Sequence, residues 1–442
     1  MTLSNVKPIY RSDSTLNNSK YQVSSETQTL RNLEEGVYTI DETIKLPWVY
    51  GTTIRGVGSA HYYGLHGGGV YAGHTTNLLW DGIKDRGINL EPPTDETGAM
   101  FHITGESTQI EKVTIGNAPI GILLNKEESG IGTGKVIMRD CYFNGCKTAF
   151  ETGPYNGNND EVTFDNVTAN GCETLLRIKN SQSMVFRIRG CFVKNGLKND
   201  TNNAEEYGGN PDKGNTEHVY VKDIIDVRAG GIVYVEDMTV IHAESVLKFN
   251  PDLDGTITEA AITAGDSEKQ ASNLGRRIGS SNGYYSLKNI KLDQQAETPM
   301  IVDMAEHFGV RIIVENVQAP QKYWRVAIDD PDREPALMYN LKGKMAITIR
   351  DCNLFEGCIA WEDGRTVDDR LIWGHNHRYC PHIKLDHCNF RGTNILDVLS
   401  KTKSKGRCYF TAKDCYASSW TEGLQDFNET RPIQDVMGYF DA

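Results

Sequence analysis

The stretch Val136-Ile137-Met138-Arg139-Asp140-Cys141-Tyr142-Phe143-Asn144-Gly145-Cys146 decides the fold, because its pattern returns along the chain. Cys141 serves as the anchor of the pattern. An apolar residue stands three places before it, a turn-forming residue one place before it and an apolar residue two places after it. The pattern surrounds ten anchors: Val113, Cys141, Val167, Cys191, Met238, Ile290, Val317, Cys352, Cys388 and Cys415.

All twenty flanking positions of these anchors are apolar. Three places before stand Ile110, Met138, Phe164, Ile188, Val235, Leu287, Val314, Ile349, Leu385 and Ala412. Two places after stand Ile115, Phe143, Ala169, Val193, Val240, Leu292, Ala319, Leu354, Phe390 and Ala417. One place before stand Lys112, Asp140, Asn166, Gly190, Asp237, Asn289, Asn316, Asp351, His387 and Asp414. Nine of these last ten are residue types that tolerate positive φ, so we expect a left-handed corner there.

The spacing of the inward residues predicts the architecture. A plain strand places inward residues at steps of two, whereas the first step here is three, so two short strands meet at a one-residue corner. Successive anchors are 28, 26, 24, 47, 52, 27, 35, 36 and 27 residues apart. Repeats of this length indicate a solenoid, whose coils bury their apolar faces by stacking. Without a helical or leucine-rich period, a parallel β-helix with three short strands per coil remains.

The repeats resemble the pectate-lyase-like right-handed β-helix superfamily, including its bacteriophage tailspike relatives. The resemblance also includes Gly36-Val37-Tyr38-Thr39-Ile40, Leu46-Pro47 and Ile54-Arg55-Gly56-Val57-Gly58, and it covers roughly residues 36–420. It implies a single right-handed parallel β-helix. It leaves function open, because the superfamily includes lyases, hydrolases, epimerases, tailspikes and inert virion proteins.

Composition and charge restrict the partners. The 442 residues carry a net charge of -13, with 46 basic and 59 acidic residues and no basic run interleaved with aromatics. We therefore expect no nucleic acid partner. The N-terminus lacks the regions of a signal peptide, and no apolar run reaches membrane-spanning length. We expect a chain that is made in the cytoplasm and inserts into no membrane.

The ten cysteines are interpreted as reduced. Five of them occupy the inward anchor position, where buried thiols behave as small hydrophobic groups. Cys146 and Cys172, each five residues after its anchor, are the pair whose spacing leaves a disulfide open.

Several segments fall outside the repeats. Residues 1–35 are expected to form an N-terminal arm with a capping helix over 26–35, because Ser25 and Gln28 make a capping box before an apolar stripe. Residues 421–442 are expected to form a tail. Long loop insertions are expected at 197–218, 250–284, 320–344 and 359–381.

The last two insertions contain the predicted site. They leave consecutive coils, which stack about 4.8 Å apart, and they concentrate aromatic and charged residues. Asp330, Asp363 and Asp369 are the candidate catalytic carboxylates, because glycoside hydrolysis needs two carboxyl groups. The candidate substrate-binding residues are Trp361, Arg365, Arg370, Trp373, His375 and Tyr379.

A lyase would use Arg365 or Arg370 against a uronate. His375, His377, Cys380 and His382 are too close in sequence for a closed zinc site, and Asp252-Leu253-Asp254-Gly255 lacks the spacing of a calcium loop. We expect neither metal nor cofactor.

The function expected from these features is that of a phage virion-associated protein, tailspike-like or particle-decorating, located on the virion surface. It would contact a host surface polysaccharide or clad the particle beside other virion proteins, as a homo-oligomer, with a trimer as one possibility. The alternative is an active polysaccharide depolymerase, either a glycoside hydrolase or a polysaccharide lyase.

Overall fold

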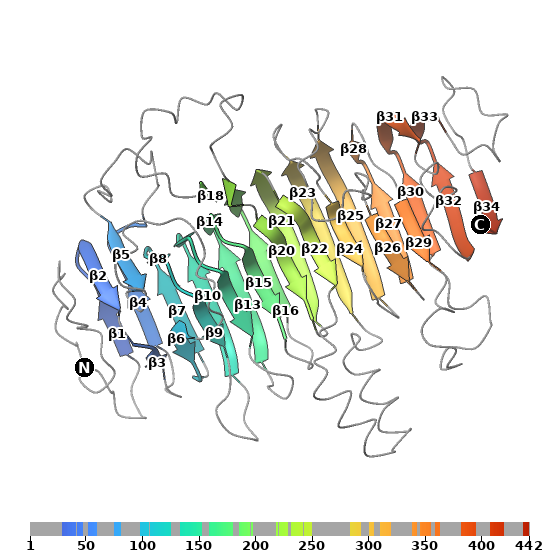
Figure 1. The fold of residues 1–442 in the computed structure, drawn as a ribbon. Helices are drawn as coiled ribbons and strands as arrows, with labels where there is room; N and C mark the ends of the chain where they lie inside the picture. The colour runs from blue at the N-terminus through green and yellow to red at the C-terminus, as the bar shows by residue number, and fades with distance from the viewer. Residues whose placement is uncertain are drawn as a thin grey trace, which may run out of the picture. The chain divides into compact units, whose positions relative to one another are not determined.

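The structure, a computed structural model, contains strands and the corners between them, and no helix, over the residues that it describes (Figure 1). The residues it describes are 29–40, 42–46, 52–59, 75–80, 98–105, 107–124, 133–152, 159–179, 185–194, 196–197, 218–219, 221–228, 231–241, 243–249, 283–292, 300–304, 310–319, 338–342, 345–354, 359–362, 382–394, 407–419 and 436–441. The chain divides into two compact units. Unit 1 holds Met1–Arg177 with Phe186–Ile224, and unit 2 holds Ile178–Val185 with Ile225–Ala442.

Unit 1 contains coils of three strands. One coil is formed by β10 (Thr133–Arg139), β11 (Tyr142–Asn144) and β12 (Thr148–Thr152). The other strands are β1 (Thr29–Asn32), β2 (Gly36–Ile40), β3 (Ile44–Leu46), β4 (Thr52–Arg55), β5 (Thr76–Trp80), β6 (Ala99–Ile103), β7 (Ser107–Glu111), β8 (Thr114–Gly116), β9 (Ile120–Leu124), β13 (Asn159–Asp165), β14 (Thr168–Asn170), β15 (Thr174–Ile178), β16 (Val185–Arg189), β17 (Phe192–Lys194), β18 (Gly196–Leu197) and β19 (His218–Val219). β15 and β16 each extend one residue across the boundary between the units.

Unit 2 repeats the same arrangement. After β20 (Val221–Val227), which runs over the boundary, come β21 (Ile232–Ile241), β22 (Ala243–Phe249), β23 (Tyr284–Leu292), β24 (Met300–Met304), β25 (Val310–Ala319), β26 (Met338–Lys342), β27 (Met345–Arg350), β28 (Asn353–Leu354), β29 (Ile359–Glu362), β30 (His382–Asp386), β31 (Asn389–Asn394), β32 (Arg407–Lys413), β33 (Tyr416–Ser419) and β34 (Val436–Asp441). We call the sheet that carries the anchors the corner sheet. The return sheet is made by β3, β6, β9, β12 and β15 in unit 1 and by β22, β24, β26 and β29 in unit 2.

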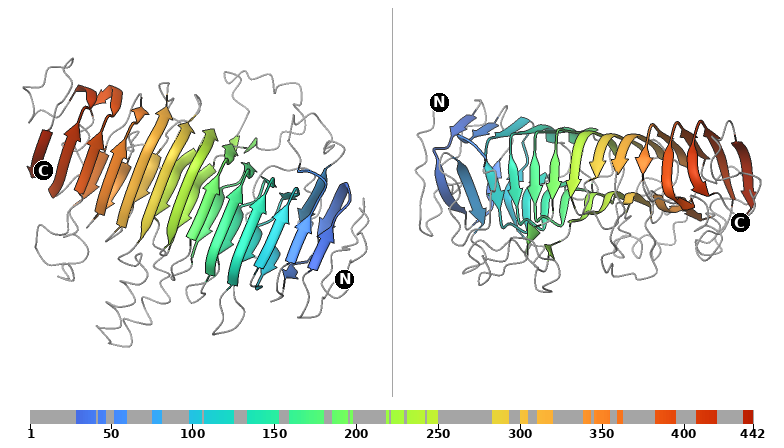
Figure 2. Two further views of the ribbon diagram at one scale, coloured as in Figure 1. Left: turned by 180° about the vertical axis from the view of Figure 1, so that it is seen from behind. Right: turned by 90° about the horizontal axis from the view of Figure 1, so that it is seen from above.

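The coils of each unit stack in parallel and in register (Figure 2). In unit 1, Met138 lies opposite Ile110 on one side and Phe164 on the other. In unit 2, Val314 lies between Leu287 and Ile349 in the same way. Equivalent positions of the repeat therefore form continuous rows, and the expected all-β parallel β-helix is confirmed.

The corners have the predicted conformation. All ten residues that precede the anchors have positive φ, between 49° and 64°, including Lys112 at 55°. Side chains connect successive corners: the Asn166 amide donates to Asp140 over 2.7 Å in unit 1, and the Asn316 amide donates to Asn289 over 2.8 Å in unit 2. The stacked turns are thus hydrogen-bonded along the row.

The predicted core is buried. All ten anchors and all ten residues three places before them are at most 2% exposed. Six of the residues two places after the anchors are equally buried, and the side chains of Ala319, Leu354, Phe390 and Ala417 lie outside the described set. The rows therefore form one apolar interior within each unit.

The predicted capping helix is wrong. Thr29–Asn32 forms strand β1, which pairs in parallel with β4. The capping-box pattern was overridden because the backbone of this segment completes hydrogen bonds with the neighbouring coil. Residues 1–28, the rest of the predicted arm, lie outside the described residues.

Three loop boundaries and the tail need correction. Strand β26 lies within the predicted loop 320–344, and β29 begins the predicted loop 359–381. At the base of the loop 197–218, β18 and β19 form an antiparallel pair. The predicted tail 421–442 contains β34, which pairs antiparallel with β32. Of the loop 250–284, only Gly283 and the start of β23 are described.

Candidate functional site

The site predicted from the sequence is described at one residue. Trp361 lies in β29, where its backbone is opposite Leu341 of β26. The two insertions are therefore neighbours at this point, as expected, but Trp361 belongs to a strand rather than to a loop. The eight other predicted residues lie outside the described residues: Asp330, Asp363, Arg365, Asp369, Arg370, Trp373, His375 and Tyr379. Their roles stay predictions.

The outer face of the corner sheet in unit 2 offers a different site. The residues that alternate with the buried rows face away from the interior, and the register places them in three outer rows. Row one contains Ile232, Tyr284, Arg311, Ala346 and His382. Row two contains Tyr234, Ser286, Ile313, Thr348, Lys384 and Thr411. Row three contains Glu236, Lys288, Glu315, Arg350, Asp386 and Lys413.

Two tyrosines form an aromatic pair on this face. The rings of Tyr234 on β21 and Tyr284 on β23 lie 5.6 Å apart between centroids, at an interplanar angle of 47°. Tyr234 is 38% exposed, one of two large apolar side chains exposed among the described residues. Ser286 lies beside Tyr234 in row two. An aromatic surface next to a hydroxyl group can pack against the apolar face of a sugar ring and bind its hydroxyls.

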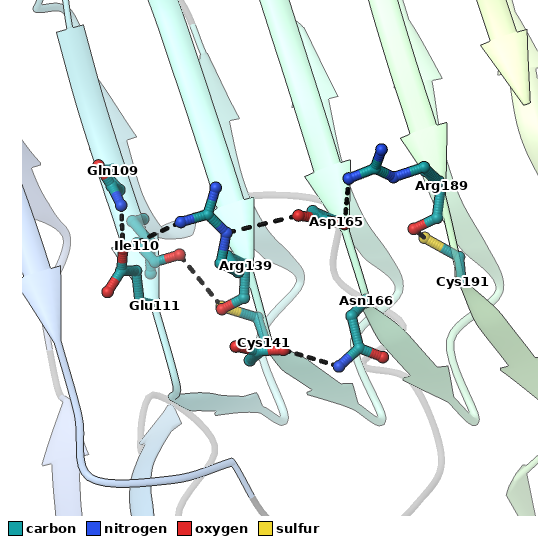
Figure 3. A network of polar contacts seen from close by, with 10 residues as sticks. Gln109, Ile110, Glu111, Arg139, Cys141, Asp165, Asn166, Arg189 and Cys191 are labelled. Atoms are coloured by element: carbon teal, nitrogen blue, oxygen red, sulfur yellow. Dashed lines mark hydrogen bonds and ion pairs between the residues drawn. The ribbon is translucent and has the colours of Figure 1, made fainter. Parts of the chain in front are cut away.

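Charged residues on the outer face of unit 1 compensate one another along the corner sheet. Arg55 lies 2.8 Å from Glu111, and Arg139 lies 3.8 Å from Glu111 and 3.4 Å from Asp165. Arg189 lies 3.2 Å from the same Asp165. Figure 3 shows Arg139 extending toward both carboxylates. Each carboxylate thus bridges cations from two neighbouring coils.

The same alternation continues in row three of unit 2. Glu315 forms ion pairs with Lys288, at 4.0 Å, and with Arg350. The register places Glu236 opposite Lys288 and Asp386 opposite Arg350, so the sign changes at every coil. Since each charge has an opposite neighbour, these ladders present little net field to a partner.

One ion pair is buried. Arg177 of β15 lies 3.4 Å from Glu151 of β12, with side-chain exposures of 9% and 7%. Each residue follows an inward apolar residue of the return sheet, Leu176 or Phe150. The pair therefore lies on the opposite side of the strands from the core. It neutralises two charges that would each be destabilising if buried alone.

The described thiols are unreactive core groups. Seven cysteines are free and buried, among them Cys146 and Cys172, so the expectation of reduced core cysteines is confirmed for these seven. Burial raises the pKa of Cys141 and of Cys191 to about 12. A thiol that stays protonated is a poor nucleophile and a poor metal ligand. Within the described ranges, no group of three histidine, cysteine or acidic side chains is arranged to hold a metal ion.

The tyrosine pair is not among the residues predicted from the sequence to form a site. Both tyrosines lie at outward positions of the repeat, four residues before the anchor Met238 and six before the anchor Ile290. Counting outward positions from the anchors would have found them. The predicted loops were selected because their aromatic residues lie close together in the sequence.

Comparisons with known proteins add no relative. No family model, no curated protein and no solved structure matches the chain. Over the residues that the structure describes, no helix has the length and hydrophobicity to cross a membrane.

Proposed function

We propose that this protein is a glycan-binding β-helix that acts on the surface of a virion, and that the Tyr234–Tyr284 pair is a contact point for the glycan. The observation that carries the proposal is this aromatic pair on the outer strand face, with Tyr234 38% exposed, Tyr284 half-buried and the rings 5.6 Å apart. Large aromatic side chains are commonly buried at least in part. Apolar groups gathered on a polar surface are often part of a binding surface.

The chemistry of the face favours a carbohydrate over an apolar partner. The two rings contribute a small apolar area, and their outer-row neighbours are Ser286, Lys288 and Glu236. These groups donate and accept hydrogen bonds at the edge of the aromatic surface. Sugars combine apolar C–H faces with equatorial hydroxyls, and this combination matches the face.

The virion location rests on the resemblance to phage β-helix proteins, which the parallel coils of both units support at the level of architecture. Reduced cysteines in the interior agree with folding in the reducing cytoplasm of a host cell before assembly. Other virion proteins and further copies of the chain are the proposed partners. The bound polysaccharide belongs to the host surface.

Binding of purified protein to a panel of bacterial surface polysaccharides tests the proposal. We expect Tyr234→Ala and Tyr284→Ala each to weaken binding about three- to tenfold, the equivalent of roughly 0.5–1.5 kcal/mol for one aromatic contact. Tyr234→Phe keeps the ring and serves as the matched control, with near-normal binding expected.

Absence of binding across the panel would contradict the proposal, as would normal binding by both alanine variants. Measuring new reducing ends and unsaturated uronate absorbance in the same samples reports on depolymerase activity. We expect binding without release of either product.

A further inference from the structure

One arginine among the described residues differs from the others in its ion pairing. Eight arginines have described side chains, and seven of them form an ion pair with a carboxylate: Arg55, Arg139, Arg177, Arg187, Arg189, Arg228 and Arg350. Arg311 is the eighth. It is exposed, and among the described residues no carboxylate lies within ion-pair distance of it.

Arg311 lies directly beside the aromatic pair. It occupies row one on β25, opposite Tyr284 on β23. Neighbouring strands are about 4.8 Å apart, so the guanidinium belongs to the coil next to the Tyr284 ring. Its other neighbour in the row is Ala346, an exposed residue with a short side chain. A ligand can therefore approach the guanidinium from the side of Ala346.

From these observations we infer that the site binds an acidic polysaccharide, with Arg311 contacting a sugar carboxylate next to the sugar that packs on the tyrosines. The inference rests on the proposed glycan-binding function. A planar guanidinium matches a carboxylate through two parallel hydrogen bonds. An arginine already paired with Asp or Glu must lose that partner to bind a ligand, whereas Arg311 has no carboxylate partner among the described residues.

The other charges that the structure describes do not supply this preference. The chain has a net charge of -13, which repels a polyanion at long range, and the ladders of alternating charge neutralise themselves. A preference for acidic glycans would therefore originate locally, from the Arg311 guanidinium. Removal of this one charge should remove the preference.

The test uses polysaccharides before and after reduction of their carboxyl groups to alcohols. Alginate and hyaluronan are included as defined uronate polymers, beside every panel glycan that binds. We expect the wild-type protein to bind the native forms about tenfold or more tightly than the reduced forms, the usual effect of one hydrogen bond to a charged group. Arg311→Gln should bind both forms as the wild type binds the reduced ones.

Arg350→Gln is the matched control, because Arg350 is exposed in the same unit but paired with Glu315. It should keep the preference for native glycan. Equal binding of native and reduced forms by the wild type, or an unchanged preference in Arg311→Gln, would overturn the inference while leaving glycan binding intact. Dextran sulfate, an anionic polymer without carboxylates, distinguishes carboxylate binding from general anion binding. If it competes with the bound glycan as well as the uronate polymers do, the carboxylate assignment is also overturned. Loss of all binding in every form is instead a failure of the proposed function.

Discussion

Replacement of Asp140 tests the conformation of the corner most directly. Asp140 joins β10 to β11 with a φ of 52°. Its Oδ1 atom accepts a hydrogen bond of 2.7 Å from the Asn166 amide on the next coil. Two separate contributions to stability therefore meet at one half-buried residue, and different substitutions remove them separately.

The structure sets the size of each contribution. A β-branched residue in the left-handed region is destabilised by about 1–2 kcal/mol, and one hydrogen bond contributes about 0.5–1.5 kcal/mol. Asp140→Val loses both, so its free energy of unfolding should fall by about 1.5–3.5 kcal/mol. Asp140→Gly loses only the hydrogen bond in the folded state, and glycine raises the conformational entropy of the unfolded chain. The free energy of unfolding of this variant should therefore fall by about 1–2 kcal/mol. Asp140→Asn keeps both and should stay within about 0.5 kcal/mol of the wild type.

Urea unfolding followed by circular dichroism measures the series, and hydrogen exchange of the Asp140 amide, which donates to the Asp165 carbonyl over 3.0 Å, reports the local effect. The expected order of stability is wild type, Asn, Gly and then Val. A valine variant as stable as the wild type would refute the left-handed corner. Equal losses in Gly and Val would show that the hydrogen bond alone matters.

Three further predictions concern charge, thiols and close packing in unit 1. Asp165→Lys places three cations in a row and should lower the free energy of unfolding, measured with urea, by about 1–2 kcal/mol at low salt. The loss should be smaller in about 1 M salt, which screens the charges. It should also be smaller in the control variant Asp165→Asn. Burial raises the pKa of Cys141 and Cys191 to about 12 from 9.0. The unfolded chain therefore ionises first, and stability should fall as pH rises from about 9 toward 12, by about 1.4 kcal/mol per pH unit for each thiol. Replacing both by Val should remove their share of this pH dependence and reduce the slope of the unfolding free energy against pH, and an unchanged slope would contradict this reasoning. Gly56→Ala would place a Cβ atom against the Lys112 carbonyl oxygen, closer than van der Waals contact allows. We therefore expect its free energy of unfolding to fall by about 1–3 kcal/mol in the same assay. A variant as stable as the wild type would refute the close approach.

The corner sheet could be predicted from the sequence because each of its structural constraints restricts the residue types that occur at a fixed position. Positive φ selects Asp, Asn, Gly and His, and the interior selects apolar residues at fixed offsets. Lys112 is not a residue type that favours positive φ, yet its φ of 55° matches that of the other corner residues. Stacking between coils fixes the conformation even where the residue is unfavourable.

The return sheet could not be predicted in the same way. β9, β12, β15 and β29 each begin seven residues after their anchors, but β22, β24 and β26 begin five, ten and twenty-one residues after theirs, so the return strands share no single offset. Met338 therefore read as part of a long loop, whereas the offset of seven residues could have placed Trp361 in a strand. The helix predicted around Thr29 failed for a related reason, because pairing with β4 is a contact between coils that no local pattern reports.

The candidate site shows the same division. Trp361 and its neighbours were selected because aromatic and acidic residues are dense in that segment, and density is visible in a sequence. Tyr234 and Tyr284 are fifty residues apart in sequence, and only the register of β21 with β23 brings their rings together. A surface site on a solenoid is distributed over coils, so its detection requires the register first.

The alternating charges add to the forces that fix this register. A slip of one residue would turn the apolar rows outward, so the buried interior already opposes it. Two places before the ten anchors, the residues are Glu111, Arg139, Asp165, Arg189, Glu236, Lys288, Glu315, Arg350, Asp386 and Lys413. Their sign changes at every step. Like charges directly opposite each other are destabilising in a sheet, whereas the native register places opposite charges beside each other along the ion pairs of unit 1 and along row three of unit 2. The outer ladder therefore reinforces the register that the interior sets.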